Sequence, residues 1–249
     1  MKIRLENVSK SLSFKEHFNA RAEVLHLLEG INCELDDGEN LAILGQSGSG
    51  KSTLAKLISF SEPKSGGKIY INNEEITDKN ELKKDIRYIL QNQKQALNPA
   101  LKVKTAIAHV RSYLKLSFSQ NELKELLANL NLKDENLEKY PSQLSGGEAT
   151  RVGILLALLS KPKILICAEI TSGLDNETKQ KIINLLLSLD EKISIIFITH
   201  DILSAMKIAQ KVLIIESGKQ VAFGKFEDLA SQNVLKKYLD AAKFYDDKL

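Results

Sequence analysis

The chain has 249 residues, of which 43% are hydrophobic and 27% are charged, as expected for a globular protein with a substantial core. Its 35 Lys and Arg residues nearly balance 32 Asp and Glu residues, so the net charge of +3 argues against nucleic acid as a partner. The two cysteines and four histidines have no disulfide-framework or metal-ligand spacing, which fits a reducing cytosol. No apolar run approaches the roughly 20 residues that cross a bilayer, so we expect no membrane span.

Strands and a glycine-rich loop are predicted for the N-terminal part of the chain. An edge strand is expected at residues 1–8, a polar irregular segment at 9–21 and a second strand at 25–35. The short apolar run at 41–44 suits a strand that is buried on both faces of a parallel sheet. A helix is predicted at 51–60, directly after the glycine-rich loop. Two further strands are predicted at 68–71 and 85–90.

The middle of the chain has helical periodicity, and strands return after it. Apolar residues at 123, 126, 127 and 130 have the spacing of an amphipathic helix. The predicted helices are 122–130, 146–160, 177–189 and 201–210, and the predicted strands are 164–167, 193–199, 211–216 and 220–222. This alternation predicts an α/β sheet with right-handed crossovers. We expect core segments at 1–91 and 153–249, with an inserted α-helical subdomain at about 92–152.

The strongest motif is G-x-x-x-x-G-K-[ST], placed between a predicted strand and a predicted helix. Its residues are Gly45, Gln46, Ser47, Gly48, Ser49, Gly50, Lys51, Ser52 and Thr53. The glycines let backbone N–H groups and the helix N-terminus face phosphate oxygens. Lys51 is expected to reach the β- and γ-phosphates of ATP and Ser52 to ligate Mg²⁺. A plain Gly/Ser-rich turn after a strand is the alternative.

A second motif, Leu144-Ser145-Gly146-Gly147-Glu148, opens a predicted helix. Ser145 and Glu148 have the spacing of a capping box, so a well-capped helix without a ligand is the structural alternative. Together with the phosphate loop, this motif resembles the signature of the ABC (ATP-binding-cassette) ATPase family. The resemblance covers residues 1 to about 225 and implies a P-loop fold with a mostly parallel sheet, an N-terminal antiparallel part and a helical insertion. It also implies that Ser145, Gly146 and Gly147 contact the γ-phosphate held by an opposing subunit.

The resemblance assigns roles to three further residues. Glu169 ends an apolar strand and matches the general base that polarises the attacking water. His200 matches the switch histidine that contacts the γ-phosphate, and Gln91 matches the glutamine that senses Mg²⁺ and water. Glu169 could instead be an ordinary acidic residue at a strand end, and His200 could be a purely structural residue. Residues 171–175 match a loop at the family's dimer contact.

The sequence departs from the family pattern near the nucleotide chemistry. Ala168 replaces the Asp that supports Mg²⁺, Ile170 replaces a usual Pro, and Leu156 stands where an Arg is common. The aromatic residue that stacks on adenine is also displaced, because the corresponding position is Leu12 and the nearest aromatic residue is Phe14. These departures leave nucleotide binding expected but put full hydrolysis in question.

The resemblance implies an ATPase subunit on the cytoplasmic face of the membrane, peripheral to transmembrane permease subunits and served indirectly by an extracytoplasmic solute-binding protein. Leu97-Asn98-Pro99 after Gln91 is similar to a mark of the nickel, dipeptide and oligopeptide importers, so nickel or short peptides are the favoured cargo. Ala168 favours a heterodimer with a sister ATPase over a homodimer. The alternatives are a hydrolysis-impaired partner cassette and a soluble ABC protein that transports nothing.

Overall fold

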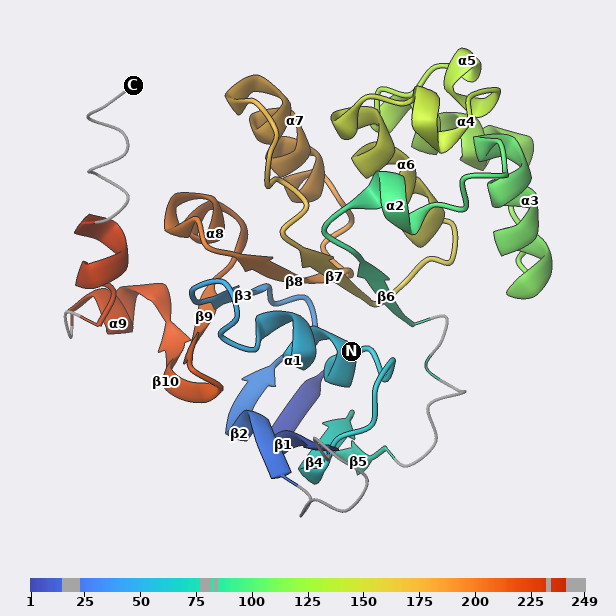
Figure 1. The fold of residues 1–249 in the computed structure, drawn as a ribbon. Helices are drawn as coiled ribbons and strands as arrows, with labels where there is room; N and C mark the ends of the chain where they lie inside the picture. Colours follow the sequence, from blue (N-terminus) through green and yellow to red (C-terminus); the bar gives the residue numbers. More distant parts are fainter. Residues whose placement is uncertain (15–22, 77–81, 83–84, 232–233, 241–249) are drawn as a thin grey trace. The chain divides into compact units, whose positions relative to one another are not determined.

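The structure is a computed structural model that describes residues 1–14, 23–76, 82, 85–231 and 234–240 (Figure 1). The chain divides into two compact units. The first unit is formed by Met1–Lys79 and Ser194–Leu249, and the second by Asn80–Ile193. The described residues contain no helix with the length and apolar character needed to cross a membrane.

The first unit is built around a mixed sheet with helices on it (Figure 1). Its elements are β1 (Ile3–Phe14), β2 (Glu23–Leu35), β3 (Leu41–Leu44), α1 (Lys51–Ile58), β4 (Gly66–Ile71), β5 (Glu74–Glu75), β8 (Ser194–Thr199), α8 (Ile202–Ile208), β9 (Lys211–Glu216), β10 (Lys219–Lys225) and α9 (Phe226–Ser231). The strand order within this unit is β5-β4-β1-β2-β10-β9-β3-β8.

The short strand β3 occupies the centre of the first unit. All four of its residues are buried, and it pairs in parallel with β8 on one side and β9 on the other. Helix α8 packs against β3 and β8. Ala42 and Leu44 of β3 join a buried cluster with residues of α8, β9 and α9. An uninterrupted apolar run is therefore buried on both faces, as the sequence predicted.

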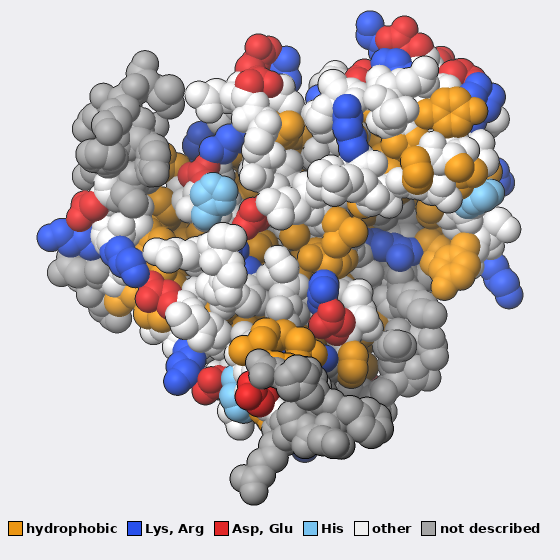
Figure 2. All heavy atoms as spheres, viewed as in Figure 1, with side chains coloured by type: hydrophobic (Ala, Val, Ile, Leu, Met, Phe, Trp, Pro, Cys, Tyr) orange, Lys and Arg blue, Asp and Glu red, His pale blue; other side chains and the backbone are white. Residues whose placement is uncertain are grey.

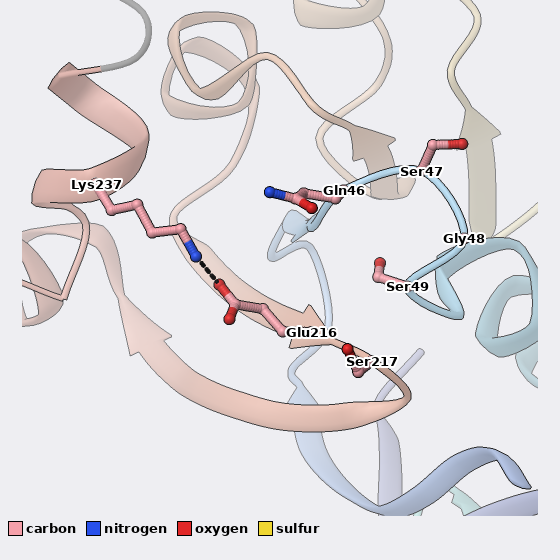
Figure 3. A pocket seen from close by; sticks show the side chains of 7 residues that line it. All are labelled: Gln46, Ser47, Gly48, Ser49, Glu216, Ser217 and Lys237. Carbon is pink, nitrogen blue, oxygen red and sulfur yellow. Dashed lines mark hydrogen bonds and ion pairs between the residues drawn. The ribbon is translucent and has the colours of Figure 1, made fainter.

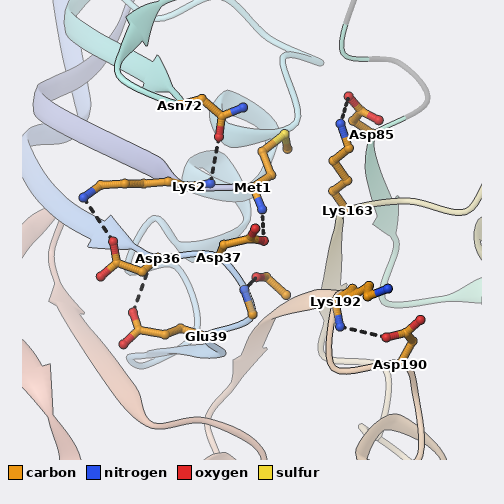
Figure 4. A network of polar contacts seen from close by, with 12 residues as sticks. Met1, Lys2, Asp36, Asp37, Glu39, Asn72, Asp85, Lys163, Asp190 and Lys192 are labelled. Carbon is orange, nitrogen blue, oxygen red and sulfur yellow. Dashed lines mark hydrogen bonds and ion pairs between the residues drawn. The ribbon is translucent and has the colours of Figure 1, made fainter.

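The N-terminal strands form an antiparallel layer in which β1 pairs with both β2 and β4. The prediction of an edge strand at residues 1–8 was wrong, because β4 covers the second side of β1. The predicted irregular segment also begins too early, since β1 continues to Phe14; residues 15–22 lie outside the described part. Figure 4 shows how the start of the chain is held: the Met1 ammonium pairs with Asp37, and the Lys2 amide donates to Asn72 Oδ1 at 3.1 Å.

The second unit pairs two strands and is otherwise helical (Figure 1). Its elements are β6 (Ile86–Ile89), α2 (Gln93–Ala96), α3 (Val103–Tyr113), α4 (Gln120–Asn129), α5 (Asp134–Leu137), a 3-10 helix (Pro141–Gln143), α6 (Gly146–Leu158), β7 (Ile164–Ala168) and α7 (Asn176–Leu187). Helix α6 is mostly buried and packs against α2, α3, α7 and β6.

The observed elements match the α/β class predicted from the sequence, with ends shifted by a few residues. Helix α1 ends at Ile58 rather than at 60, and α8 spans Ile202–Ile208 rather than 201–210. Asp201 is excluded from α8 because its carboxylate caps the helix, accepting from the amides of Leu203 and Ser204. The assignment of 92–152 as an inserted subdomain stays a prediction.

Candidate functional site

The glycine-rich loop of the first unit links β3 to α1 and is shaped by its glycines. Gly50 caps α1 with a φ of 105°, a left-handed conformation that glycine adopts without strain. A Cβ on Gly45 would lie 2.3 Å from the carbonyl oxygen of Ile215, so no larger residue fits there. The loop therefore turns tightly from the buried strand into the helix, which leaves the first backbone N–H groups of α1 at its inner side.

Lys51, the first residue of α1, folds back into this loop. Its side chain is buried, and Nζ donates to the carbonyl oxygens of Gly45 at 2.9 Å and Gln46 at 2.8 Å. Ser52, the next residue, is exposed. The ammonium is thus held inside the loop by neutral acceptors, where an anion would be a stronger partner.

Ser49 has a buried hydroxyl that lacks a partner. The residue is 5% exposed, and its Oγ accepts or donates no hydrogen bond among the described residues. Ser49 also lines a cavity of about 160 Å³ beside the loop (Figure 3). The other lining residues are Gln46, Ser47, Gly48, Glu216, Ser217 and Lys237. The Ser49 hydroxyl is therefore available to a water molecule or to a polar ligand in the cavity.

His200 lies at the same sheet edge as the loop. Leu44 of β3 is paired with Thr199 of β8, so the loop and His200 follow the carboxyl ends of neighbouring parallel strands. Thr199 Oγ1 accepts from the amide of Asp201 at 3.0 Å, and the His200 side chain is exposed. This edge is where ligands bind in open α/β sheets.

Gln91 and Glu169 of the second unit are brought together by a similar register. Ile89 of β6 pairs with Cys167 of β7. Gln91 and Glu169 each lie two residues further along the chain, so both follow the carboxyl ends of this strand pair. Gln91 Nε2 donates to Glu169 Oε2 at 2.9 Å. Glu169 has a φ of 46°, a left-handed conformation uncommon outside glycine, and such strain concentrates at functional positions. Ala168 ends β7 and is buried, with a methyl group where a carboxylate was expected.

The capping box predicted at the start of α6 is confirmed. Ser145 Oγ accepts from the Glu148 amide at 3.1 Å, and the Ser145 amide donates to Glu148 Oε2 at 2.7 Å. Asn136 and Lys139 both donate to the other carboxylate oxygen. The backbone amide of Ser145 is the main reason that the pKa of Glu148 falls to about 2.

Gly147 has a packing role besides the role implied by the resemblance. A Cβ at this position would lie 2.6 Å from Cγ2 of Thr178, so α6 approaches α7 closely only with glycine here. Gly146 is exposed. Asp175 caps α7 by accepting from the Thr178 amide at 2.8 Å.

The two candidates for the adenine contact lie on β1. Leu12 and Phe14 are 46% and 45% exposed, and alternation places them on one face of the strand. Leu12 is paired across the sheet with Leu25, which is also exposed. The exposed apolar surface of β1 therefore continues onto β2 through the Leu12–Leu25 pair, which the sequence did not predict.

The second unit also contains a groove. It measures about 290 Å³ and is mostly apolar. It is lined by Arg87, Tyr88, Leu90, Gln93, Ala96, Leu97, Val110, Tyr113, Leu114, Gly153, Leu156 and Ala157. Figure 2 shows hydrophobic and basic side chains next to one another over β6 and α3. Leu156, first noted as a departure from the family, belongs to its apolar lining.

The predicted site residues are thus distributed over both units. The first unit holds residues 45–53 and His200, while the second holds Gln91, Glu169, Ser145, Gly146 and Gly147. The described residues contain no group of three or more His, Cys, Asp or Glu side chains that could bind a metal ion by themselves.

Comparisons with known proteins identify the family and the fold of the chain. The family model for the ABC transporter matches residues 28–172, more than half of the chain. The methionine import ATP-binding protein MetN 2 of Bacillus cereus is 36% identical over 92% of this chain and 68% of its own length. The di/tripeptide transport ATP-binding protein DppF of Pseudomonas aeruginosa is 29% identical over 89% of this chain and 70% of its own length.

A solved structure shows the same fold. The ATP-binding cassette MJ0796, in a dimeric post-hydrolysis state bound to ADP and Pi, superposes with a TM-score of 0.77 at 29% identity. The match covers 90% of this chain and 98% of that one. With the phosphate loop, the capped signature helix and these relatives in agreement, the chain belongs to the ABC transporter family as an ATP-binding cassette, an ATPase whose hydrolysis is coupled to transport.

Proposed function

We propose that the chain is the ATPase subunit of an importer, bound to permease subunits at the cytoplasmic face of the membrane. The observation that carries the proposal is the phosphate loop, with Lys51 held inside it and the Ser49 hydroxyl left without a partner. A triphosphate would offer anionic oxygens to the Lys51 ammonium and a hydrogen-bond partner to the Ser49 hydroxyl. The backbone N–H groups of residues 45–53 would cradle these oxygens at the start of α1.

Mg²⁺ fits the oxygen donors that the chain offers. The exposed hydroxyl of Ser52 and the side-chain amide of Gln91 are hard oxygen ligands, and Mg²⁺ in ATPases takes most of its remaining ligands from phosphates and water. When bound, Mg²⁺ would neutralise charge on the phosphate oxygens. Glu169, held by Gln91 in the structure, would orient and deprotonate the attacking water. His200 would contact the γ-phosphate from the end of β8.

The signature helix would act on a second cassette. Ser145, Gly146 and Gly147 lie at the N-terminus of α6, where the helix dipole favours a negative ligand. The proposal assigns them to the γ-phosphate of a sister subunit. The described structural relative is itself a dimer, which supports the paired arrangement. Because Ala168 offers no carboxylate, we favour a sister with Asp at that position over a second copy of this chain.

The groove of the second unit would receive a helix from a permease subunit. Its walls are mostly apolar, and the guanidinium of Arg87 contributes a cation. Arg87 Nε donates to Ser160 Oγ at 2.9 Å, and no carboxylate of the described residues is paired with it. Burial lowers the pKa of Arg87, which means that its charged form is incompletely solvated. An amphipathic helix that carries an acidic residue would satisfy both features.

The identity of the transported solute is the most specific part of the proposal. Leu97, Asn98 and Pro99 favour nickel or short peptides by their resemblance to those importers, and one relative is a di/tripeptide transport protein. MetN 2, which has a higher sequence identity to this chain than DppF has, is a methionine import protein. Within the tripeptide, Leu97 lines the groove and Asn98 forms a turn in which its Oδ1 accepts from the Ala100 amide at 3.0 Å. The tripeptide thus shapes the chain next to the groove.

An uptake assay in cells that lack the protein tests the proposal. Wild-type protein should restore uptake of nickel or of short peptides, whereas Lys51→Ala should not. Arg87→Glu should lose co-purification with the permease subunits, and Lys94→Glu, the same charge change at an exposed position of α2, should keep it. Restored uptake of methionine alone would replace the cargo assignment. Normal uptake of every tested solute without the protein would remove the importer assignment.

A further inference from the structure

A lysine from the C-terminal part of the chain lines the same cavity as the phosphate loop. Lys237 is far from residues 45–53 in sequence, yet it shares the cavity of about 160 Å³ with Gln46, Ser47 and Ser49 (Figure 3). Figure 3 shows its side chain extended toward Glu216, and Nζ lies 2.7 Å from Glu216 Oε1. The cavity is thus bordered by the loop on one side and by an ion pair on the other.

The segment that carries Lys237 is anchored on the core beneath the loop. Leu235 is fully buried in the cluster that contains Ala42 and Leu44 of β3, the strand that leads into the loop. Tyr238 packs against the same cluster, and its hydroxyl donates to Glu216 Oε1 at 2.8 Å. Two contacts of different kinds therefore fix the backbone on either side of Lys237.

Glu216 in turn is fixed to the loop. Leu44 pairs with Ile214, so Glu216 at the end of β9 is level with the first residues of the loop. The next turn is held by a backbone hydrogen bond from Gly218 to the carbonyl oxygen of Ser49 at 3.0 Å. Lys237 is consequently held at a defined place beside the loop, while its 62% exposed side chain keeps the freedom to change partners.

We propose that Lys237 is a further nucleotide-binding residue, whose ammonium leaves Glu216 for a phosphate oxygen when ATP occupies the phosphate loop. The inference rests on the proposed use of residues 45–53 for ATP. Glu216 and a phosphate are competing anions for one mobile ammonium. The triphosphate carries more charge and also satisfies the orphaned Ser49 hydroxyl in the same cavity. Glu216 then keeps its hydrogen bond from Tyr238.

Calorimetric titration of the full chain with Mg·ATP tests the exchange. Lys237→Met keeps the aliphatic stem and should weaken ATP binding roughly fivefold at low salt, the scale of a partly exposed charge contact. The loss should shrink at high ionic strength because the side chain is exposed. Lys236→Met, the same change at the exposed neighbouring position, should bind ATP as the wild type does.

Glu216→Gln separates a ligand contact from a structural ion pair. If Lys237 contacts the phosphate, removal of its competitor should leave ATP binding as tight as in the wild type or tighter. If the pair only anchors the segment, Glu216→Gln and Lys237→Met should weaken binding equally, and this result overturns the proposal. Unchanged affinity in Lys237→Met also overturns it. Lys51→Ala in the same assay reports on the phosphate loop itself: retained affinity there contradicts the proposed ATP site.

Discussion

Two helices begin with candidate phosphate-binding residues, and their N-termini are capped differently. Helix α1 of the first unit begins at a left-handed Gly50 without a side-chain cap, next to a buried Ser49 hydroxyl that has no partner among the described residues. Helix α6 of the second unit begins with a reciprocal box in which Ser145 and Glu148 satisfy one another. The start of α1 leaves one buried hydroxyl without a hydrogen bond, whereas the two capping side chains of α6 satisfy one another within the protein.

The same contrast holds for the charged groups nearby. Lys51 rests on two neutral carbonyl oxygens, which an anion would displace or supplement. Glu169 already accepts from Gln91, and Glu148 accepts from Ser145, Asn136 and Lys139. We propose that nucleotide changes the contacts of these groups in the first unit, whereas the groups of the second unit are already held in place by hydrogen bonds within the protein. This difference can be tested by substitutions on each side.

The largest effect is expected for Lys51→Ala. Loss of a buried, hydrogen-bonded charge partner typically costs about 2–5 kcal/mol, so ATP affinity should fall by roughly two orders of magnitude or more. At an ATP concentration of 100 Kd the wild type should gain about 2.7 kcal/mol in the free energy of unfolding, and the variant should gain almost nothing. Thermal unfolding with and without Mg·ATP measures both. An ATP-induced gain as large as that of the wild type would show that the loop is complete without its lysine.

The next effect is expected for Ala168→Asp in the second unit. The carboxylate would add an outer-shell partner for Mg²⁺, a type of contact whose loss typically costs about 10–100-fold in activity or metal affinity. The isolated variant should therefore hydrolyse ATP faster than the isolated wild type. Addition of a sister ATPase with Asp at this position should raise the turnover of the wild type. A wild-type chain that turns over briskly alone at low Mg²⁺, with no gain from Asp, would contradict the asymmetric pair.

A smaller effect is expected for Glu148→Ala at the start of α6. Loss of the capping box should lower the free energy of unfolding by about 1–2 kcal/mol at pH 7. Because the pKa of Glu148 in the folded protein, about 2, is below its ordinary value of 4.5, its ionised form favours the folded state. Its contribution is complete above about pH 4.5 and is lost as the pH falls toward 2, so the variant and the wild type should converge in acid.

Two variants control this measurement by urea unfolding at several pH values. Glu148→Gln keeps a side chain that can accept from the Ser145 amide but does not titrate, so its stability should depend less on pH than that of the wild type. Glu125→Gln changes an exposed carboxylate of α4 and should alter neither the stability nor its pH dependence. A wild type and a Glu148→Ala variant that differ equally at pH 7 and pH 3 would show that the ionised carboxylate does not stabilise the box.

The contrast between the units also explains what the sequence could predict. The phosphate loop and the capping box depend on residues close together in the chain, and both were located from spacing alone. The short strand β3 was also predicted, because an apolar run of four residues between a turn and a glycine-rich loop has few alternatives. Residue roles beyond geometry came from the family resemblance rather than from periodicity.

Features that depend on distant pairing were not predictable in this way. The strand β1 was expected to be an edge, but β4 pairs with it across a long separation in sequence. Lys237 has no motif around it, and the contacts of Leu235 and Tyr238 bring it to the cavity of the phosphate loop. The groove around Arg87 combines β6, α2, α3 and α6, so its full lining depends on packing between segments that are distant in sequence. Each of these features arises from tertiary packing.

The smallest effect is expected for Ser49→Ala, and it has opposite signs with and without ligand. The hydroxyl is buried without a partner, so its removal should leave the free energy of unfolding of the nucleotide-free protein unchanged or raise it by up to about 1 kcal/mol. The same removal should weaken ATP binding roughly fivefold, because a hydrogen bond to the ligand contributes about 0.5–1.5 kcal/mol. Ser145→Ala is the matched change at the other helix start and should instead lower the stability of the nucleotide-free protein by about 1 kcal/mol. Unfolding and calorimetric titration of both variants give the four values. If Ser49→Ala destabilises the nucleotide-free chain as much as Ser145→Ala does, the Ser49 hydroxyl has a hydrogen-bond partner inside the protein. That result would contradict the proposal that this hydroxyl gains its partner from the bound nucleotide.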